Sequence, residues 1–531
     1  MTAPSSPLVL LILDGFGLSP AVAGNAILNA KTPTLDRLTS QYPYVALRAH
    51  GTEVGLPWGE MGNSDVGHVN LGAGRIVLQD VTRITMAIDD GSFATNEALL
   101  AACRRVKETG GTLHCLGLAS PGGVHGHIDH LLALLSLAHA QGVNNIHVHL
   151  IADGRDTEPR ALTTYLARLE QGAAKAGAQI RSLAGRYYAM DRDQRWDRTR
   201  AAYAAIARAE APYQAATLSQ AVLQAYQRGE SDEFIQPTLI GRATQASAVL
   251  NAQSDVVIFT NYRSDRARQL AQALGQAEFA DFQRPEAPCT LVTMTDYGVE
   301  LAAGTVAFPE PALANQFAAV VAHAQLRQLH VAETEKYAHA TYFFNGGVEP
   351  TFPGEKRLLI HSPKVTTYDQ APAMAVPEVM NALLAALASQ SCEVAIVNLA
   401  SPDMVGHTGN LAATTQAIEV VDRELGRLLT VVETGQARLL LTADHGNAEQ
   451  LIHPETGDID KEHTTNPVPL LYADPHHQRE RVPLAEAKLT FMAEQPIGIL
   501  ADVAPTALEL LGLTPPTEMT GQSLLSELER S

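Results

Sequence analysis

The stretch Leu8-Val-Leu-Leu-Ile-Leu13, followed directly by Asp14-Gly-Phe-Gly17, decides the fold class. Six consecutive apolar residues predict a short β-strand. The polar, glycine-containing cluster that begins at Asp14 predicts the end of that strand. Because the same pairing of an apolar run with a polar cluster recurs along the chain, this stretch indicates the architecture of the whole protein.

Four further apolar runs end in the same way, and helical stretches rich in alanine and leucine lie between them. The runs are 146–151 before Asp153, Val256–Phe259 before Asn261, Val394–Leu399 before Ser401, and Arg438–Thr442 before Asp444. Stretches with helical spacing include 198–208, 314–328 and 415–429. This alternation predicts an α/β fold with mainly parallel sheets. Functional sites in such folds lie at the carboxyl ends of the strands.

Any one of these polar clusters has a simpler interpretation, since Asp, Asn and Gly commonly begin turns. Five clusters that together carry Asp, His and Arg favour a functional site over five unrelated turns.

Composition and charge exclude several classes of protein. The chain has 531 residues, of which 46% are hydrophobic and 18% are charged, as in an ordinary globular protein. The formal net charge of -19 disfavours nucleic acid and anionic membranes as partners. No apolar run approaches the roughly 20 residues of a membrane helix. The four cysteines show no metal-binding spacing, which indicates a reducing compartment, and we expect the protein to be cytoplasmic.

Two segments have the character of linkers: the residues after Gly72-Ala-Gly-Arg-Ile76, and Phe308-Pro-Glu-Pro311. We therefore predict a discontinuous metal-binding domain formed by 1–77 and 312–531, with a substrate-binding α/β domain inserted at 78–311.

Carboxylate and imidazole side chains cluster after the predicted strands of the two ends of the chain. Asp403 and His407 are four residues apart after one strand, Asp444 and His445 follow another, and His463 lies further on. This ligand set suits Mn²⁺ or Zn²⁺, and the oxygen ligands favour Mn²⁺. Together with Asp14, these residues predict a site for two metal ions, although each histidine alone could be a surface or core residue.

Ser64 lies in the turn Met61-Gly-Asn-Ser64-Asp-Val-Gly-His68, which leads into a predicted helix. A serine at a helix N-terminus beside a metal ion is well placed to act on a phosphate group. Alternatively, Ser64 or Asn63 serves as the N-cap of the helix. The spacing alone does not separate these two interpretations.

The middle region is rich in arginine. Converging guanidinium groups indicate a small ligand with several negative charges. Asp156, beside Arg155, is a candidate general acid or base. The alternative is a set of surface ion pairs of little energetic value. The candidates are His125, Arg155, Asp156, Arg186, Arg192, Arg263 and Arg266.

Eleven motifs in a fixed order resemble those of the 2,3-bisphosphoglycerate-independent phosphoglycerate mutases, a family of the alkaline-phosphatase-like superfamily. They include Asp14-Gly-Phe-Gly17, the turn around Ser64, Asp153-Gly-Arg-Asp-Thr157, Glu333-Thr-Glu-Lys-Tyr-Ala-His339 and Ala443-Asp-His-Gly-Asn447. The resemblance covers nearly the whole chain. It implies an isomerase of glycolysis and gluconeogenesis that interconverts 3-phosphoglycerate and 2-phosphoglycerate without 2,3-bisphosphoglycerate.

The resemblance also implies the role of each site residue. Ser64 is the nucleophile that forms a phosphoserine intermediate, and Lys336 offsets charge on the phosphoryl group. Asp156 moves a proton between the hydroxyls of glycerate, and the middle-region residues named above bind the substrate together with Lys336. One Mn²⁺ ion is held by Asp403, His407 and His463, and the other by Asp14, Ser64, Asp444 and His445. Other divalent ions are possible, and we expect a monomer because the proposed site uses one chain.

A two-metal phosphomonoesterase of the same superfamily is the alternative function. The long inserted domain with its arginine set favours the mutase.

Overall fold

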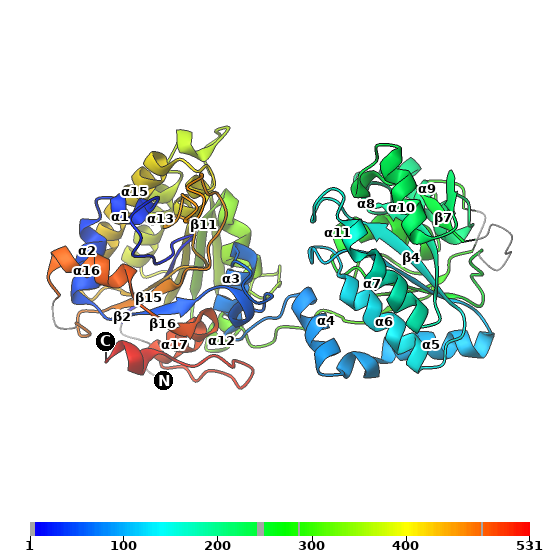
Figure 1. The fold of residues 1–531 in the computed structure, drawn as a ribbon. Coiled ribbons are helices and arrows are strands. Elements are labelled where there is room, and N and C mark those ends of the chain that lie inside the picture. The colour runs from blue at the N-terminus through cyan, green and yellow to red at the C-terminus, as the bar shows by residue number, and fades with distance from the viewer. Residues whose placement is uncertain (1–5, 242–248, 285–286, 479–481, 531) are drawn as a thin grey trace. The chain divides into compact units, whose positions relative to one another are not determined.

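The computed structural model describes residues 6–241, 249–284, 287–478 and 482–530. The chain divides into two compact units: unit 1 comprises Met1–Leu78 and Ala312–Ser531, and unit 2 comprises Gln79–Pro311. Each unit is a sheet with helices packed on it, and the two units are treated separately below (Figure 1).

Unit 1 contains an eight-stranded sheet in which β15 is antiparallel to both of its neighbours and all other pairs are parallel. The spatial order of its strands is β12 (Glu355–Ile360), β11 (Gln328–Glu333), β13 (Val394–Leu399), β1 (Leu8–Leu13), β14 (Arg438–Thr442), β15 (Val468–Ala473), β2 (Tyr44–Arg48) and β16 (Pro496–Ile499).

The helices of unit 1 are α1 (Ala26–Asn29), α2 (Pro33–Gln41), α3 (Ser64–Ala73), α12 (Phe317–His323), α13 (Val376–Ala388), α14 (Ser401–Gly406), α15 (Leu411–Glu433), α16 (Leu484–Met492), α17 (Val503–Leu510) and α18 (Leu525–Leu528). Every residue of β1, β13 and β15 is buried, as expected for strands covered by helices on both faces.

Unit 2 contains a second eight-stranded sheet, in which the pair β5 and β7 is antiparallel and the other pairs are parallel. Its order is β10 (Gly304–Val306), β9 (Thr290–Thr293), β8 (Val256–Phe259), β3 (Leu113–Leu118), β4 (Ile146–Ala152), β5 (Gln179–Gly185), β7 (Thr238–Ile240) and β6 (Tyr213–Ala215). Its helices are α4 (Asp80–Asp89), α5 (Glu97–Thr109), α6 (Ile128–Ala140), α7 (Leu162–Lys175), α8 (Arg186–Ala189), α9 (Trp196–Ala207), α10 (Leu218–Gln227) and α11 (Ser264–Gly275).

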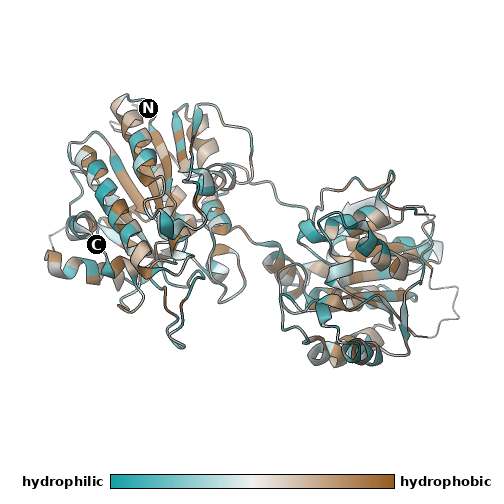
Figure 2. Cartoon of the chain, turned by 90° about the horizontal axis from the view of Figure 1, so that it is seen from above, coloured by the Kyte–Doolittle hydropathy of each residue, from teal (hydrophilic) through white to brown (hydrophobic). Residues whose placement is uncertain are grey.

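Each unit has its own apolar core, built mainly from strand residues and the inner faces of the helices. Figure 2 shows the strands of both sheets in hydrophobic colours, while hydrophilic residues alternate along the outer helices. No helix in the part of the chain that the structure describes is long and apolar enough to cross a membrane.

The structure confirms the predicted α/β class with mainly parallel sheets, and all five predicted strands are present. One predicted helix is too long. The stretch 314–328 forms α12 only over Phe317–His323, because Gln325 adopts a left-handed backbone with a φ of 59° and β11 begins at Gln328.

Candidate functional site

Three adjacent parallel strands of unit 1 end at the same edge of the sheet, and each is followed by a carboxylate. Asp14 follows β1, Asp403 lies in α14 directly after β13, and Asp444 follows β14. Because β13 and β14 both pair with β1 in parallel, the chain brings these three carboxylates together. All three are at most 1% exposed.

Ser64 is the first residue of α3, and Asn63 is the N-cap. The Asn63 side chain accepts a hydrogen bond from the backbone N–H of Val66 at 3.0 Å. Since Asn63 caps the helix, the hydroxyl of Ser64 is not used as a cap, and the capping interpretation applies to Asn63 alone.

The Ser64 hydroxyl points into a cluster of charged and ligating groups. Its Oγ lies 3.3 Å from Asp14 Oδ1, 2.9 Å from His445 Nε2 and 2.6 Å from Lys336 Nζ. Ser64 is also buried, so its hydroxyl faces these groups and not bulk water.

Lys336 lies on a turn directly after β11 and extends its ammonium group among the carboxylates. Besides Ser64, its Nζ contacts Asp14 Oδ1 at 2.6 Å and Asp403 Oδ2 at 2.7 Å. Burial lowers the pKa of the lysine, but the carboxylates of Asp14, Asp403 and Asp444 outweigh burial and raise it above its usual value. Lys336 is therefore a permanent cation beside the serine.

The first candidate metal site is the predicted set of Asp14, Ser64, Asp444 and His445. In the structure, ligand atoms of Asp14, His68 and Asp444 lie within 4.8 Å of one another. Asp444 Oδ1 accepts hydrogen bonds from the backbone N–H groups of Gly15 and His445. Asp444 Oδ2 is buried, with His68 Nδ1 3.2 Å away and His445 Nε2 3.4 Å away. Carboxylate oxygens and imidazole nitrogens gathered in this way fit a divalent metal ion.

Asp403, His407 and His463 form the second candidate metal site. His407 Nδ1 lies 2.7 Å from the carbonyl of Lys461, and His463 Nδ1 lies 2.8 Å from the carbonyl of Gly62. Carbonyl groups only accept hydrogen bonds, so each Nδ1 carries a proton and Nε2 is the ring atom that could bind a metal ion. Burial lowers the pKa of His463, but its hydrogen bond to Asp403 and the charge of that carboxylate outweigh burial and raise it.

The spacing of the three ligand atoms in this second set matches a metal site. The two Nε2 atoms are 3.0 Å apart, and each lies 3.3 Å from Asp403 Oδ1. Ligands of a tetrahedral ion with bonds near 2.1 Å are separated by about 3.4 Å. A divalent cation between these three atoms would be within bonding reach of all of them.

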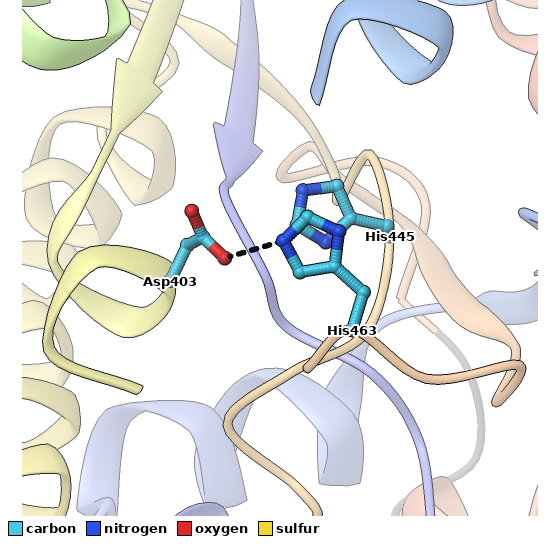
Figure 3. Close-up of side chains that lie close together, drawn as sticks. All are labelled: Asp403, His445 and His463. Atoms are coloured by element: carbon cyan, nitrogen blue, oxygen red, sulfur yellow. Dashed lines mark ion pairs between the residues drawn. The ribbon is translucent and has the colours of Figure 1, made fainter. Parts of the chain in front are cut away.

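His445 lies between the two sets. Its ring stacks on that of His463, with centroids 3.8 Å apart, and Figure 3 shows the two rings together facing Asp403. Ligand atoms of Asp403, His445 and His463 all lie within 4.8 Å of one another. Burial lowers the pKa of His445, which favours the neutral imidazole that binds metal.

Sequence reasoning missed two buried residues beside Asp14 and Asp444: His68, whose ring offers a possible ligand atom of the same cluster, and Asn398. The Asn398 amide donates to Asp14 Oδ2 at 2.7 Å and lies 3.0 Å from His68 Nε2. His68 Nδ1 in turn lies 3.2 Å from Asp444 Oδ2. The available signals were the spacing of His68 four residues after Ser64 and an asparagine inside the apolar run of β13.

In unit 2, Asp265 gathers three of the predicted substrate-binding residues. Its carboxylate lies 2.8 Å from Arg192 Nη1, 3.3 Å from Arg263 Nε and 3.5 Å from His125 Nδ1. Burial and the nearby Arg186 lower the pKa of His125 to about 4, so His125 is a neutral hydrogen-bonding group at neutral pH.

Arg186 is buried at the N-terminus of α8 and joins two carboxylates. Its Nη1 lies 2.6 Å from Asp153 Oδ1 and 2.5 Å from Asp156 Oδ2. Arg155 is more exposed and lies 3.8 Å from Glu233. Asp156, the candidate general acid or base, therefore pairs with the buried Arg186.

A cavity of about 230 Å³ in unit 2 is lined by Arg155, Arg186 and Arg266. Burial and the positive charges of Arg192, Arg186 and Arg155 lower the pKa of Arg266. This repulsion indicates more guanidinium groups than the local carboxylates balance, which fits an anionic ligand. Arg195 and Arg198 also line the cavity and were not among the predicted residues.

Comparison with known proteins gives one consistent family. Residues 84–299 match the family described as BPG-independent PGAM N-terminus. A 2,3-bisphosphoglycerate-independent phosphoglycerate mutase of Moorella thermoacetica is 48% identical over 98% of this chain and 99% of its own length. The corresponding protein of Thiobacillus denitrificans is 46% identical, again over 98% of this chain and 99% of its own length.

A solved structure agrees with this result. The phosphoglycerate mutase of Leishmania mexicana, crystallised at low cobalt concentration, aligns with a TM-score of 0.64 and 27% identity, covering 98% of each chain. With sequence identity near one half along almost the entire length, the chain belongs to the family of 2,3-bisphosphoglycerate-independent phosphoglycerate mutases.

Proposed function

We propose that this chain interconverts 3-phosphoglycerate and 2-phosphoglycerate by way of a phosphoserine at Ser64, with two Mn²⁺ ions as its metals. The reaction is that of its family, an isomerisation of glycolysis that needs no 2,3-bisphosphoglycerate. The observation that carries the proposal is the position of the Ser64 hydroxyl, 2.6 Å from Lys336 Nζ and 2.9 Å from His445 Nε2.

The two candidate ligand sets suit Mn²⁺, since they mix carboxylate oxygen with imidazole nitrogen. Asp403, His407 and His463 would hold one ion, and Asp14, Ser64, Asp444 and His445 the other. When bound, such ions supply Lewis acidity toward the phosphate and lower the pKa of a bound hydroxyl.

Ser64 and Lys336 carry out phosphoryl transfer in this proposal. The Ser64 hydroxyl gives up its proton to water as its Oγ attacks the phosphorus of 3-phosphoglycerate, so that the Oγ–P bond forms and the bond from phosphorus to the C3 oxygen breaks. In the second transfer the C2 oxygen attacks the same phosphorus, the Oγ–P bond breaks, and Ser64 takes back a proton from water. The Lys336 ammonium donates hydrogen bonds to the charge that develops there, and it is already held in place by Asp14 and Asp403.

Unit 2 supplies the residues that retain glycerate while the phosphoryl group is on Ser64. Arg155, Arg186, Arg192, Arg263 and Arg266 bind its carboxylate and hydroxyls, together with His125. The C3 oxygen takes up a proton as it leaves, and the C2 hydroxyl loses one before it attacks the phosphoserine. Asp156 carries this proton, and its ion pair with Arg186 orients the carboxylate.

The four cysteines are all buried and unpaired, as in proteins of a reducing compartment, which supports a cytoplasmic location. Every proposed ligand comes from one chain, which supports a monomer.

Product analysis separates the mutase from a phosphomonoesterase that shares the metal-binding residues. The purified protein is incubated with 3-phosphoglycerate and Mn²⁺, without 2,3-bisphosphoglycerate. We expect 2-phosphoglycerate with little free phosphate. Free phosphate without 2-phosphoglycerate would show that the chain is a phosphatase.

A further inference from the structure

Glu449 is a buried glutamate that lies outside both candidate ligand sets. Only 1% of it is exposed. Its Oε2 accepts hydrogen bonds from the backbone N–H groups of Gly17, at 3.0 Å, and Asn447, at 2.8 Å. Its Oε1 accepts from the Asn466 amide at 2.9 Å and from the Thr464 hydroxyl. Four donors thus use both oxygens of one carboxylate.

These four donors lie on two loops that carry candidate metal ligands. Gly17 belongs to the loop after β1, which carries Asp14. Asn447, Thr464 and Asn466 belong to the long loop between β14 and β15, which carries Asp444 and His445 near its start and His463 near its end. Glu449 therefore connects residues of both candidate metal sites through one side chain.

Two glycines allow this connection. A Cβ atom on Gly17 would lie 2.3 Å from Glu449 Cδ, and a Cβ atom on Gly446 would lie 2.4 Å from Glu449 Oε1. Neither glycine has a positive φ, so the backbone conformation does not require glycine at these positions. Glycine is needed because the Glu449 carboxylate lies too close to leave room for a side chain. The loops after β1 and β14 can therefore approach the Glu449 carboxylate this closely only with glycine at positions 17 and 446.

Backbone hydrogen bonds join the same loops. The N–H of Ala448 donates to the carbonyl of Gly15 at 2.9 Å, and the N–H of Thr464 donates to the carbonyl of Gly446 at 3.0 Å. Glu449 forms no ion pair with a basic side chain among the described residues, so its contribution comes from hydrogen-bond geometry.

We propose that Glu449 is a positioning residue that fixes the spacing between the two candidate metal sites by holding the loop after β1 against both ends of the loop between β14 and β15. This inference rests on the proposed function, because it assumes that both ligand sets bind divalent ions. Removal of a residue that supports the direct ligands typically weakens metal affinity by about 10- to 100-fold.

The test is calorimetric titration of Mn²⁺ into metal-free protein, comparing wild type with Glu449→Asp. Aspartate keeps the charge but is one methylene shorter, so it cannot reach all four donors. We expect the dissociation constants of both ions to rise roughly tenfold or more, and turnover to recover when Mn²⁺ is in excess. Unchanged affinity for both ions would overturn the inference.

Asp422→Asn is the matched control. Asp422 on α15 is also a buried carboxylate, and it accepts the backbone N–H groups of Thr34 at 3.1 Å and Leu35 at 2.7 Å at the start of α2. This substitution should lower thermal stability and leave Mn²⁺ affinity unchanged. A loss of affinity equal to that of Glu449→Asp would show that general destabilisation is the cause, and would overturn the positioning role.

A milder variant keeps the inference testable if Glu449→Asp does not fold. Thr464→Val removes one of the four donors, next to His463, and we expect it to weaken one of the two binding steps. Unchanged Mn²⁺ affinity in both binding steps would overturn the inference. Failure of the proposed function gives a different result, since wild type would then bind Mn²⁺ no better than Asp403→Asn.

Discussion

At the scale of single residues, the charge around Ser64 is the main feature of unit 1. Asp14, Asp403 and Asp444 are buried carboxylates, and Lys336 is the cation that contacts two of them together with the serine. Three negative charges and one positive charge leave an excess of negative charge in a dry environment, which favours the binding of further cations. Lys336 therefore has two opposing effects: it stabilises a transferring phosphoryl group and repels metal ions.

Lys336→Met separates these two effects. We expect turnover to fall at least about a hundredfold, because a hydrogen-bond donor to the developing charge is lost. We expect Mn²⁺ to bind more tightly, because a positive charge is removed from the site. Steady-state kinetics and calorimetric titration measure the two quantities. Lys488→Met, at an amine that donates to the carbonyl of Ala30, is the control and should change neither. Weaker Mn²⁺ binding by Lys336→Met would contradict this account of the charge.

Sequence patterns identified the site residues that follow strands, and missed the residues that hold those site residues in place or line the cavity of unit 2. Asp14, Asp403, Asp444 and His445 follow apolar runs directly, so their convergence followed from the parallel sheet. Glu449 has no such signal. Its hydrogen-bond partner Gly17 is hundreds of residues away in the sequence, and Thr464 lies at the other end of the same long loop. Arg195 and Arg198 were not among the predicted residues, since local sequence does not reveal which arginines line a cavity.

At the scale of secondary structure, α3 positions the serine. Its N-terminus begins at Ser64, and Asn63 fixes that start by capping the N–H of Val66. The strands were predicted with nearly correct bounds, because buried parallel strands are continuous apolar runs. Helix ends were predicted less well: α12 stops at His323, where a left-handed residue and a strand follow within a few positions.

Asn63→Ala tests whether the N-cap of α3 also contributes to turnover by anchoring the backbone of Ser64. Loss of the cap should cost about 1 kcal/mol of unfolding free energy and lower turnover, since the backbone that carries Ser64 loses its anchor. Asn96→Ala is the matched control, because Asn96 caps α5 in unit 2 in the same way. It should cost a similar free energy and leave turnover at the wild-type level. Denaturant titration and kinetics of both variants provide the comparison, and equal turnover in the two would contradict a role for this cap.

At the scale of the whole molecule, the chain is built from two units with separate cores and different chemistry. The candidate metal ligands all lie in unit 1, and the arginine-rich cavity lies in unit 2. A ligand that binds the native state stabilises the part of the molecule that holds it. Removal of metal should therefore affect the two units unequally.

Hydrogen exchange with and without EDTA measures this difference. We expect faster exchange in the segments that surround the candidate ligands, including α3 and α14, when metal is removed. Metal at a hundredfold excess over its dissociation constant contributes about 2.7 kcal/mol. Peptides from β3, β4 and β5 in unit 2 should exchange at the same rate in both conditions. Equal acceleration in both units would contradict the assignment of the metal sites to unit 1.

The central claim is that Ser64 carries the phosphoryl group during the reaction. The most direct measurement is acid quenching of the Mn²⁺-loaded protein during turnover of 3-phosphoglycerate, followed by mass spectrometry of its peptides, with Ser64→Ala treated in parallel. The account predicts phosphate on Ser64 in the wild-type protein, and neither phosphate nor turnover in Ser64→Ala. Turnover by Ser64→Ala at the wild-type rate would contradict it.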